Sequence, residues 1–444
     1  MGGLGREMHE LMAELFPITR SVAGPGYRET LDRLEQVSGP LERHRFASGE
    51  QVLDWTVPRE WTIREAWIKA PSGEKVVDFR DSNLHIVSHS VAVSGRFSRA
   101  ELDRHLHSLP DKPDAIPYRT SYYADDWGFC LADAQRRALP DGEYEVTIDA
   151  DLSDGHVEVG ELTLPGSSPA EVLLSTYCCH PSLANNELSG PVVAAFLARE
   201  LARRPGGRRL TYRFVFVPET IGAIAYLSRF GERLRRRLAA GYVVTCVGDP
   251  GDFTYKRSRR GDSLADRAAQ HALRHAAVPH RIVDYYPAGS DERQYCSPGY
   301  NLPVGSLMRS MWGSYPEYHT SLDDLSLVTP DALAGSLSLY TRVIEVLEAA
   351  ETWEVTVPYG EPQLGRRGLY PSVGGGQLPG AADAQRRIDD MMFLLNYCDG
   401  GHDLIDAGDR VGRPVWELRP VAESLAEHGL LKRADRARQA QSAA

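Results

Sequence analysis

Two histidines and several carboxylates follow apolar segments of this sequence, and they belong to the residue types that bind zinc. His180 ends the run "EVLLSTYCCH", and Glu219 directly follows "RFVFVP". Asp249 follows "VVTCVG", and His319 lies in "YPEYHTSLDD". Neutral imidazole and carboxylate oxygen are typical zinc ligands, and a catalytic zinc keeps one position for water. Each residue alone could instead cap a helix or close a turn, but their repetition after successive strands favours a metal site.

The stretch "HPSLANNELSG" crowds polar groups around the first of these histidines. Ser189 is expected to cap the helix "SGPVVAAFLARELA", because serine is a preferred N-cap residue. Asn186 and Glu187 then lie in a tight loop that faces the edge of the sheet. Glu187 could therefore reach a metal held by His180.

The elements that would position these residues form an α/β core. From 170 to 350, apolar strand-like segments alternate with longer helical segments, and the strands are apolar on both faces. This pattern is typical of a mostly parallel sheet flanked by helices. Ligands of such sheets bind beyond the carboxyl ends of the strands. We expect the residues after each strand to meet there, including Ser290, which follows "IVDYYPAG".

Changes in composition divide the rest of the chain. Short alternating segments over residues 41–159 predict an inserted antiparallel β domain, so the catalytic domain consists of 1–40 and 160–355. Residues 356–383 are rich in Gly and Pro and predict a linker. Residues 384–444 contain three short helical segments, which predict a winged-helix-like module.

Composition limits the partners and the location of the protein. The 444 residues carry a net charge of −11, and the third helical segment of the tail, "PVWELRPVAESLAEH", is rich in glutamate, so nucleic acid is not an expected partner. No apolar run reaches the roughly 18 residues of a membrane span, and the first residues lack a secretion signal. Six scattered cysteines without a C-x-x-C pair favour the reducing cytoplasm. Cys178 and Cys179 point to opposite faces of their strand and are interpreted as structural. The sequence leaves a homo-oligomer open.

Four motifs give the chain a family resemblance, namely "HPSLANNELSG", "PETIGAIAYL", "GSDERQYCSPG" and "YPEYHTSLDDL". They are similar to those of a bacterial zinc aminopeptidase family with an inserted β domain and a C-terminal winged helix. This family is a divergent branch of the di-zinc aminopeptidase superfamily. The resemblance covers essentially the whole chain, and it implies the zinc aminopeptidase fold and a metal-dependent hydrolase.

The resemblance also implies a set of metal and base residues. The matched positions are His180 and His319 for the two histidines, Asp249 for the second aspartate and Glu219 for one of a glutamate pair. Asn186 stands where a metal-bridging aspartate is expected, and Pro218 stands where the other glutamate is expected. An amide cannot supply the charge that bridges two zinc ions, so one zinc is predicted unless Glu187 replaces the bridge. The ligands of a single zinc would be His180, Glu187 and His319, with Asp249 as a further ligand or as a partner that orients His180.

The expected activity is metal-dependent hydrolysis of an amide, in the first place by an aminopeptidase acting on a peptide. Zinc would activate a water molecule and Glu219 would act as general base. Asp291 or Glu292 would bind the free amino group, Arg293 would bind a carboxylate, and Asn186 is grouped with these substrate-binding residues. One alternative is an amidase or deacylase that acts on a small metabolite or a natural-product intermediate. Another is a catalytically silent binding or regulatory protein that retains the fold.

Overall fold

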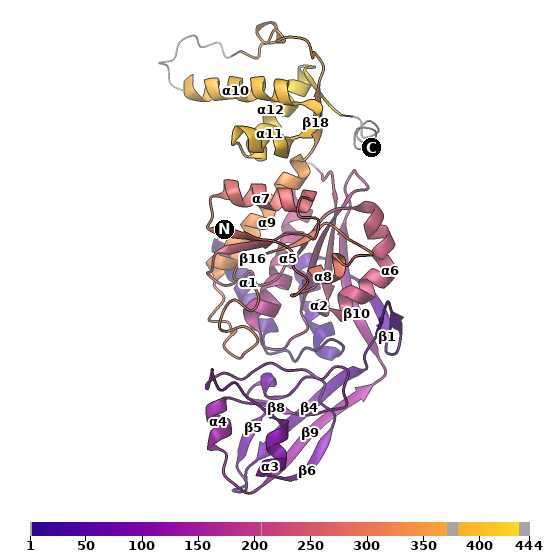
Figure 1. Cartoon of the computed structure of the whole chain (residues 1–444), viewed down its shortest axis with the longest axis vertical. Helices are drawn as coiled ribbons and strands as arrows, with labels where there is room; N and C mark the ends of the chain where they lie inside the picture. The colour runs from indigo at the N-terminus through magenta and orange to yellow at the C-terminus, as the bar shows by residue number, and fades with distance from the viewer. Residues whose placement is uncertain (1, 206, 371–380, 435–444) are drawn as a thin grey trace. The chain divides into compact units, whose positions relative to one another are not determined.

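The computed structural model describes residues 2–205, 207–370 and 381–434, and the chain divides into two compact units (Figure 1). The first unit contains Met1–Asp266 and Pro279–Ser338, and the second contains Arg267–Val278 and Leu339–Ala444. Within the described ranges, no helix has the length and apolar character that crossing a membrane requires.

An eight-stranded sheet forms the centre of the first unit. Its strands, in spatial order, are β1 (Glu42–Ala47), β10 (His156–Leu164), β12 (Thr211–Val217), β11 (Glu171–Tyr177), β13 (Leu238–Val243), β16 (Val304–Met308), β14 (Phe253–Lys256) and β15 (His280–Val283). The four strands from β12 to β16 are mutually parallel. β10 on one side and the pair β14 and β15 on the other run antiparallel to them. The predicted α/β class is confirmed, with a mixed sheet whose centre is parallel.

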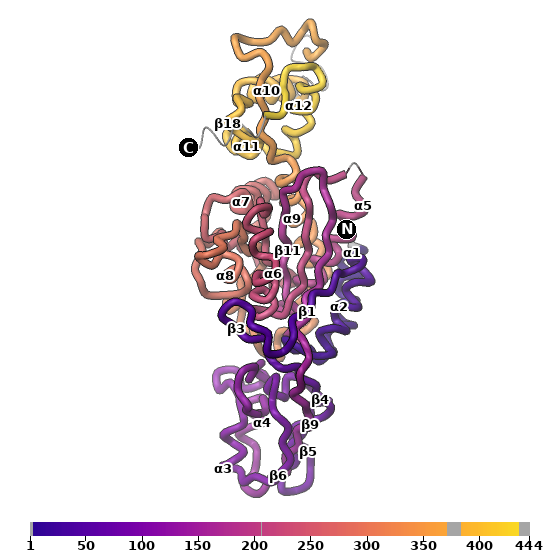
Figure 2. Tube along the Cα trace, turned by 90° about the vertical axis from the view of Figure 1, so that its right-hand side faces the viewer, coloured from indigo at the N-terminus to yellow at the C-terminus, as the bar shows by residue number. Residues whose placement is uncertain are grey.

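Helices cover both faces of this sheet. Those of the first unit are α1 (Gly2–Leu15), α2 (Pro25–Ser38), α5 (Ser189–Arg203), α6 (Ile221–Arg237) and α8 (Glu292–Tyr295), whereas most of α7 (Leu264–Ala276) and of α9 (Pro330–Ala349) belongs to the second unit. Figure 2 shows α1, α2 and α5 on one side of the strands and α6 and α8 on the other. Because both faces are covered, every residue of β11 is buried, which explains why this strand is an uninterrupted apolar run rather than an alternating one.

The strand β15 runs opposite to the direction that the sequence analysis expects. The strand β14, which the sequence analysis does not include, inserts antiparallel beside β16, and β15 pairs parallel to β14. The carboxyl end of β15 therefore lies at the other edge of the sheet. The loop after β15 nevertheless brings Asp291 to Thr220, whose backbone N–H donates to Asp291 Oδ1 over 2.7 Å.

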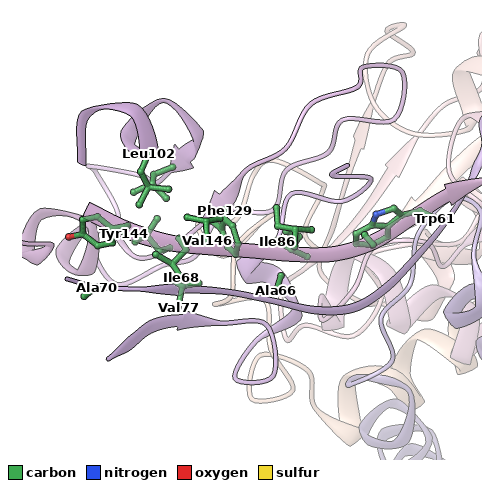
Figure 3. Packing of buried hydrophobic residues seen from close by; sticks show 14 residues of the cluster. Trp61, Ala66, Ile68, Ala70, Val77, Ile86, Leu102, Phe129, Tyr144 and Val146 are labelled. Carbon is green, nitrogen blue, oxygen red and sulfur yellow. The ribbon is translucent and has the colours of Figure 1, made fainter. Parts of the chain in front are cut away.

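The inserted β module has its own sheet and core. The sheet order is β5 (Lys75–Asp78), β4 (Glu60–Lys69), β9 (Glu143–Ser153) and β6 (Val93–Ser98), and all neighbours are antiparallel. Smaller elements are β2 (Gln51–Val52), β3 (Trp55–Thr56), η1 (Asn83–His85), α3 (Arg99–Leu102), η2 (Asp103–His105), β7 (Leu106–His107), β8 (Phe129–Cys130) and α4 (Asp133–Ala138). Trp61, Ile68, Phe129 and Tyr144 pack in one buried cluster along this sheet (Figure 3). The strand β1 lies within the range predicted for this module but pairs with β10 in the large sheet.

The second unit contains the winged helix. A three-stranded sheet has the order β18 (Asp399–Asp403), β17 (Thr352–Val355) and β19 (Leu431–Arg433), with α10 (Ala381–Tyr397), α11 (Leu404–Val411) and α12 (Val415–Glu427). The strand β17, placed by the sequence analysis at the end of the catalytic domain, pairs with β18 and β19. The predicted linker holds the short η4 (Gly365–Arg367). Its residues 371–380 lie outside the described residues, as do residues 435–444.

The helix α7 is joined to the winged helix by side-chain contacts inside the second unit. His271 Nδ1 lies 2.7 Å from Asp409 Oδ1, and the backbone N–H of Val415 donates to His271 Nε2 over 3.0 Å. Arg267 donates to Asp403 over 2.6 Å and to Asp406 over 2.7 Å. Both imidazole nitrogens are thus engaged, which fixes the tautomer with the proton on Nδ1.

Candidate active site

A pocket of about 410 Å³ opens beyond the carboxyl ends of β11 and β12. Two parts of the chain contribute its walls. From the α/β core come Cys179, His180, Glu219, Thr220, Arg293 and His319, and from the inserted module come Trp55, Tyr118, Arg119, Tyr122 and Tyr123. The pocket therefore holds imidazole, carboxylate, guanidinium and aromatic groups together.

His180 is fixed at the end of β11 by two buried partners. Its backbone N–H donates to Glu187 Oε2 over 3.0 Å, and its carbonyl accepts from Nε of the fully buried Arg20 over 3.0 Å. Its Nδ1 contacts Glu187 Oε1, and its Nε2 lies 3.6 Å from Glu219 Oε2. Burial lowers the pKa of His180, but the charges of Glu187 and Glu219 outweigh it, so the pKa is raised overall. The imidazole thus lies between two carboxylates.

Glu187 lies in a single turn of π-helix, Ala184–Leu188, that leads directly into α5. The turn begins where Asp323 accepts the backbone N–H groups of Asn185 (2.6 Å) and Asn186 (3.0 Å). Asp323 is therefore the capping group, and the prediction that Ser189 caps the helix is wrong. Ser189 Oγ instead donates to the carbonyl of Asn185 over 2.5 Å, because the helical turn already begins before it. Such π-turns are frequent at functional sites.

Glu219 is held in place by the segment that precedes α8. Ser290 Oγ donates to Glu219 Oε1 over 3.0 Å, and Asp291 accepts the N–H of Thr220 over 2.7 Å. Thr220 has a φ of 65°, an uncommon value for a β-branched residue. Burial raises the pKa of Glu219 above its ordinary value, although His180 opposes the shift. A carboxylate with a raised pKa is suited to accept a proton near neutral pH.

His319 lies on the opposite wall, between two tyrosines. Its ring stacks on Tyr318 at 3.9 Å, meets the edge of Tyr118 at 5.5 Å and lies 5.3 Å from the ring of His180. Its Nε2 is buried and makes no hydrogen bond to a described residue. Burial, together with the nearby His180, lowers the pKa of His319 to about 3. The imidazole is therefore neutral and offers a free lone pair, as a metal ligand must.

These donor groups fit a metal ion. One ligand atom each from Cys179, His180 and Glu187 lies within 4.8 Å of the others, and the unpartnered nitrogen of His319 lies on the facing wall. Thiol, imidazole and carboxylate are all zinc ligands. The sequence analysis interprets Cys179 as structural, whereas the structure places its Sγ 3.2 Å from His180 Nδ1. His180, Glu187 and His319 would hold a single ion, with Cys179 beside them.

Asp249 and Asn186 are occupied elsewhere. The carboxylate of Asp249 accepts from Asn185 Nδ2 (2.9 Å), Ser310 Oγ (2.5 Å) and the N–H of Gly251 (2.8 Å). It thus fixes Asn185 rather than His180. Asn186 is buried and donates its amide to Tyr177 Oη over 3.1 Å. Neither residue lines the pocket.

Asp291 and Glu292 lie behind the pocket wall. Both side chains are fully buried, and neither lines the pocket. Asp291 accepts the N–H of Thr220, and Glu292 forms an ion pair of 2.7 Å with the equally buried Lys256. Arg293, the third residue of this group in the sequence analysis, does line the pocket, and its Nη2 donates to Thr220 Oγ1 over 3.3 Å.

The sequence analysis misses the wall contributed by the inserted module. The hydroxyl groups of Tyr118 and Tyr122 are 2.7 Å apart, and the N–H of Tyr118 donates to the carbonyl of His319 over 2.9 Å. A further backbone hydrogen bond of 2.8 Å joins Ser321 to Ile116. The segment "IPYRTSYYADDW" has three tyrosines among twelve residues and lies between β7 and β8, outside the helices and strands. This cluster of aromatic residues outside a strand is the feature of the sequence that could have indicated the pocket wall.

Both parts of the chain are similar to known protein families. Residues 9–350 match a family model described as "Domain of unknown function (DUF4910)", and residues 351–433 match one described as "winged helix-turn-helix". A Clostridium acetobutylicum protein named "Putative polysaccharide biosynthesis protein with aminopeptidase-like domain" is 43% identical over 428 residues, which cover 96% of each chain.

Two solved structures are also similar. A crystal structure described as a "putative peptidase" from Clostridium acetobutylicum superposes with a TM-score of 0.89 and 41% identity, covering 97% of each chain. A zinc aminopeptidase from Bacillus subtilis has a TM-score of 0.55 and 12% identity, covering 77% of this chain and 94% of its own. At this identity, the second likeness establishes a shared fold only.

Proposed function

Because this chain belongs to the DUF4910 family, an aminopeptidase-like domain here followed by a winged helix, we propose that it is a metal-dependent amide hydrolase with one zinc ion. The observation that carries the proposal is the convergence of His180, Glu219 and His319 on one pocket, with the buried Glu187 in contact with His180. Fold likeness alone would not support an activity, since one fold serves many reactions. The coarse conclusion of a peptidase-like hydrolase agrees with the names of its relatives.

The chain supplies a base and a hydrogen-bond donor. A bound zinc ion lowers the pKa of water and polarises the amide carbonyl. Glu219 accepts the proton of the attacking water, and Ser290 holds the carboxylate in one orientation. Burial keeps the pKa of Tyr118 and Tyr122 well above 10, so both phenols are protonated. One of their two protons makes the mutual hydrogen bond, which leaves the other to donate to a substrate oxygen.

An aminopeptidase is the first candidate, because the chain shares the fold of zinc aminopeptidases. A deacylase or amidase that acts on a small metabolite is the second candidate. It is favoured by the position of Asp291 and Glu292, which are buried away from the pocket and cannot bind a terminal ammonium group. The relative named for polysaccharide biosynthesis points in the same direction.

Zinc analysis and two substitutions test this proposal. The purified protein is expected to bind one zinc ion per chain. His319→Ala should lose most of the metal, because a catalytic site has no spare protein ligand. Glu219→Gln should keep the metal and lose about 10²–10⁴-fold in hydrolysis of a susceptible amide, because the amide side chain cannot accept a proton. A protein that binds no zinc would support the silent alternative, in which the fold is retained for binding or regulation.

A cytoplasmic location belongs to the same proposal. The six cysteines are all buried, and none forms a disulfide. Reduced cysteines without pairing are typical of proteins in a reducing compartment. Fractionation of the native cells, with an antibody against this protein, would test the location.

A further inference from the structure

Two guanidinium groups that line the pocket have no ion-pair partner among the described residues. Arg293 donates to Thr220 Oγ1, its Nε is buried without a hydrogen-bond partner among the described residues, and it forms no ion pair with a described carboxylate. Arg119 is exposed on the facing wall and likewise has no such ion pair. Unpaired guanidinium groups that line a pocket are suited to bind a carboxylate, because their fork of donors matches its two oxygens.

The same pocket offers little to a free amino group. Among the described residues that line it, Glu219 is the one with a carboxylate, and the proposed reaction needs this carboxylate for the proton of water. Asp291 and Glu292 are turned away and already bonded to Thr220 and Lys256. An ammonium group would therefore meet two positive charges without a free carboxylate, which disfavours its binding.

Aromatic side chains of the inserted module form the remaining wall. Trp55 and Tyr123 pack edge to face at 5.6 Å and are 40% and 57% exposed. Tyr118 and Tyr122 continue this surface toward His180 and His319. Aromatic rings that line a pocket bind planar or apolar groups. The pocket thus combines two cationic groups, an aromatic surface and the zinc ligands.

We infer that the substrate is an N-acylated amine whose amine part carries a carboxylate, and that Arg119 and Arg293 bind this carboxylate. The inference rests on the proposed amide hydrolysis and names its substrate class. In the reaction, the oxygen of water bonds to the acyl carbon and the C–N bond breaks. The proton taken by Glu219 passes to the leaving nitrogen. The products are a carboxylic acid and an amine that retains the original carboxylate.

Binding of three probes to the Glu219→Gln protein tests the inference without hydrolysis. N-benzoylglycine has the aromatic acyl group and the carboxylate, N-benzoylglycinamide lacks the charge, and phenylalaninamide has a free amine. We expect N-benzoylglycine to bind about tenfold to a hundredfold more tightly than N-benzoylglycinamide by calorimetry, as for charge-assisted hydrogen bonds. Phenylalaninamide and N-benzoylglycine are also titrated into the protein with Glu219 intact, because the substitution removes a negative charge.

Three further variants in the same Glu219→Gln background locate the effect. Arg293→Gln and Arg119→Gln should each reduce the preference for N-benzoylglycine at least several-fold. Arg104→Gln is the matched control, since Arg104 is exposed on the inserted module and does not line the pocket, and the preference should persist. Arg119 is an exposed residue, so its substitution keeps the test valid if Arg293→Gln fails to fold.

Several results would overturn the inference. They are equal affinity for the charged and uncharged benzoyl probes, a preference unchanged by both pocket substitutions, tighter binding of phenylalaninamide when Glu219 is intact, or binding of no probe. Failure of the proposed function is distinguishable. A charge-dependent binding that depends on Arg119 and Arg293, without hydrolysis of any amide by the zinc-loaded protein, would remove the hydrolase and retain the carboxylate site.

Discussion

Substitution of Lys256 by methionine should strongly destabilise the first unit. Lys256 Nζ and Glu292 Oε1 are 2.7 Å apart, and both side chains are fully buried. Lys256 also donates to the carbonyl of Ala288 over 2.7 Å and lies 4.1 Å from the ring centre of Tyr286. Lys256→Met fills a similar volume but leaves the carboxylate of Glu292 buried without its cation.

The expected loss in free energy of unfolding follows from the removal of one partner of a buried ion pair. Removing one partner of a buried pair typically costs about 3–5 kcal/mol. The second oxygen of Glu292 already lacks a hydrogen-bond partner among the described residues, so nothing local replaces the ammonium group.

Urea unfolding followed by circular dichroism would measure this loss of stability. The double variant Lys256→Met/Glu292→Met is the matched control, because it removes both charges and should recover most of the stability. A loss below about 1 kcal/mol in the single variant would refute the reasoning, since that is the range of solvent-exposed pairs. So would a double variant as unstable as the single one.

Three other predictions concern separate parts of the molecule. Asn186→Asp should leave the zinc content at one per chain, because residue 186 is buried outside the pocket and the carboxylate of Asp249 is already bonded to Asn185 and Ser310; a rise toward two in metal analysis would contradict this. Burial lowers the pKa of His89 to about 3 in the folded protein, below the unfolded value of 6.5, so the protein loses stability as the pH falls below 6.5. Between pH 8 and pH 5 this loss is about 2 kcal/mol, and urea titrations should show that His89→Asn abolishes it. The helix α12 carries Glu417, and its Arg419 forms an ion pair of 2.9 Å with Glu423, so the helix offers little positive charge to DNA phosphates. Fluorescence anisotropy with duplex DNA should therefore detect no salt-sensitive binding, and a steep salt dependence would contradict this.

The residues of the site that follow parallel strands could be predicted from the sequence. His180 and Glu219 follow β11 and β12, which are parallel neighbours, so their side chains meet at one edge. Glu187 is near them because it lies seven residues after His180, within one turn and one loop. These relations depend on short separations along the chain and on a general property of parallel sheets, and both can be read from one sequence.

Contacts between distant segments account for the part that sequence could not show. Asp323 caps the turn at Asn185 from a separation of 138 residues, and Tyr118 reaches His319 from the inserted module. The insertion of β14 reversed β15, although the sequence of β15 has no feature that reports direction. The role of such residues depends on packing across the fold, which neither periodicity nor spacing along the chain reports.

The contacts of α7 with the winged helix limit how the gene can be rearranged. The two family matches meet at residues 350 and 351, yet His271 and Arg267, well before this boundary, depend on Asp409 and Asp403 beyond it. A truncation at the boundary would leave a buried imidazole and a guanidinium without acceptors. The two matched regions therefore cannot be exchanged independently of each other. A chimera with another winged helix would have to supply these carboxylates, or α7 would have to be exchanged with it.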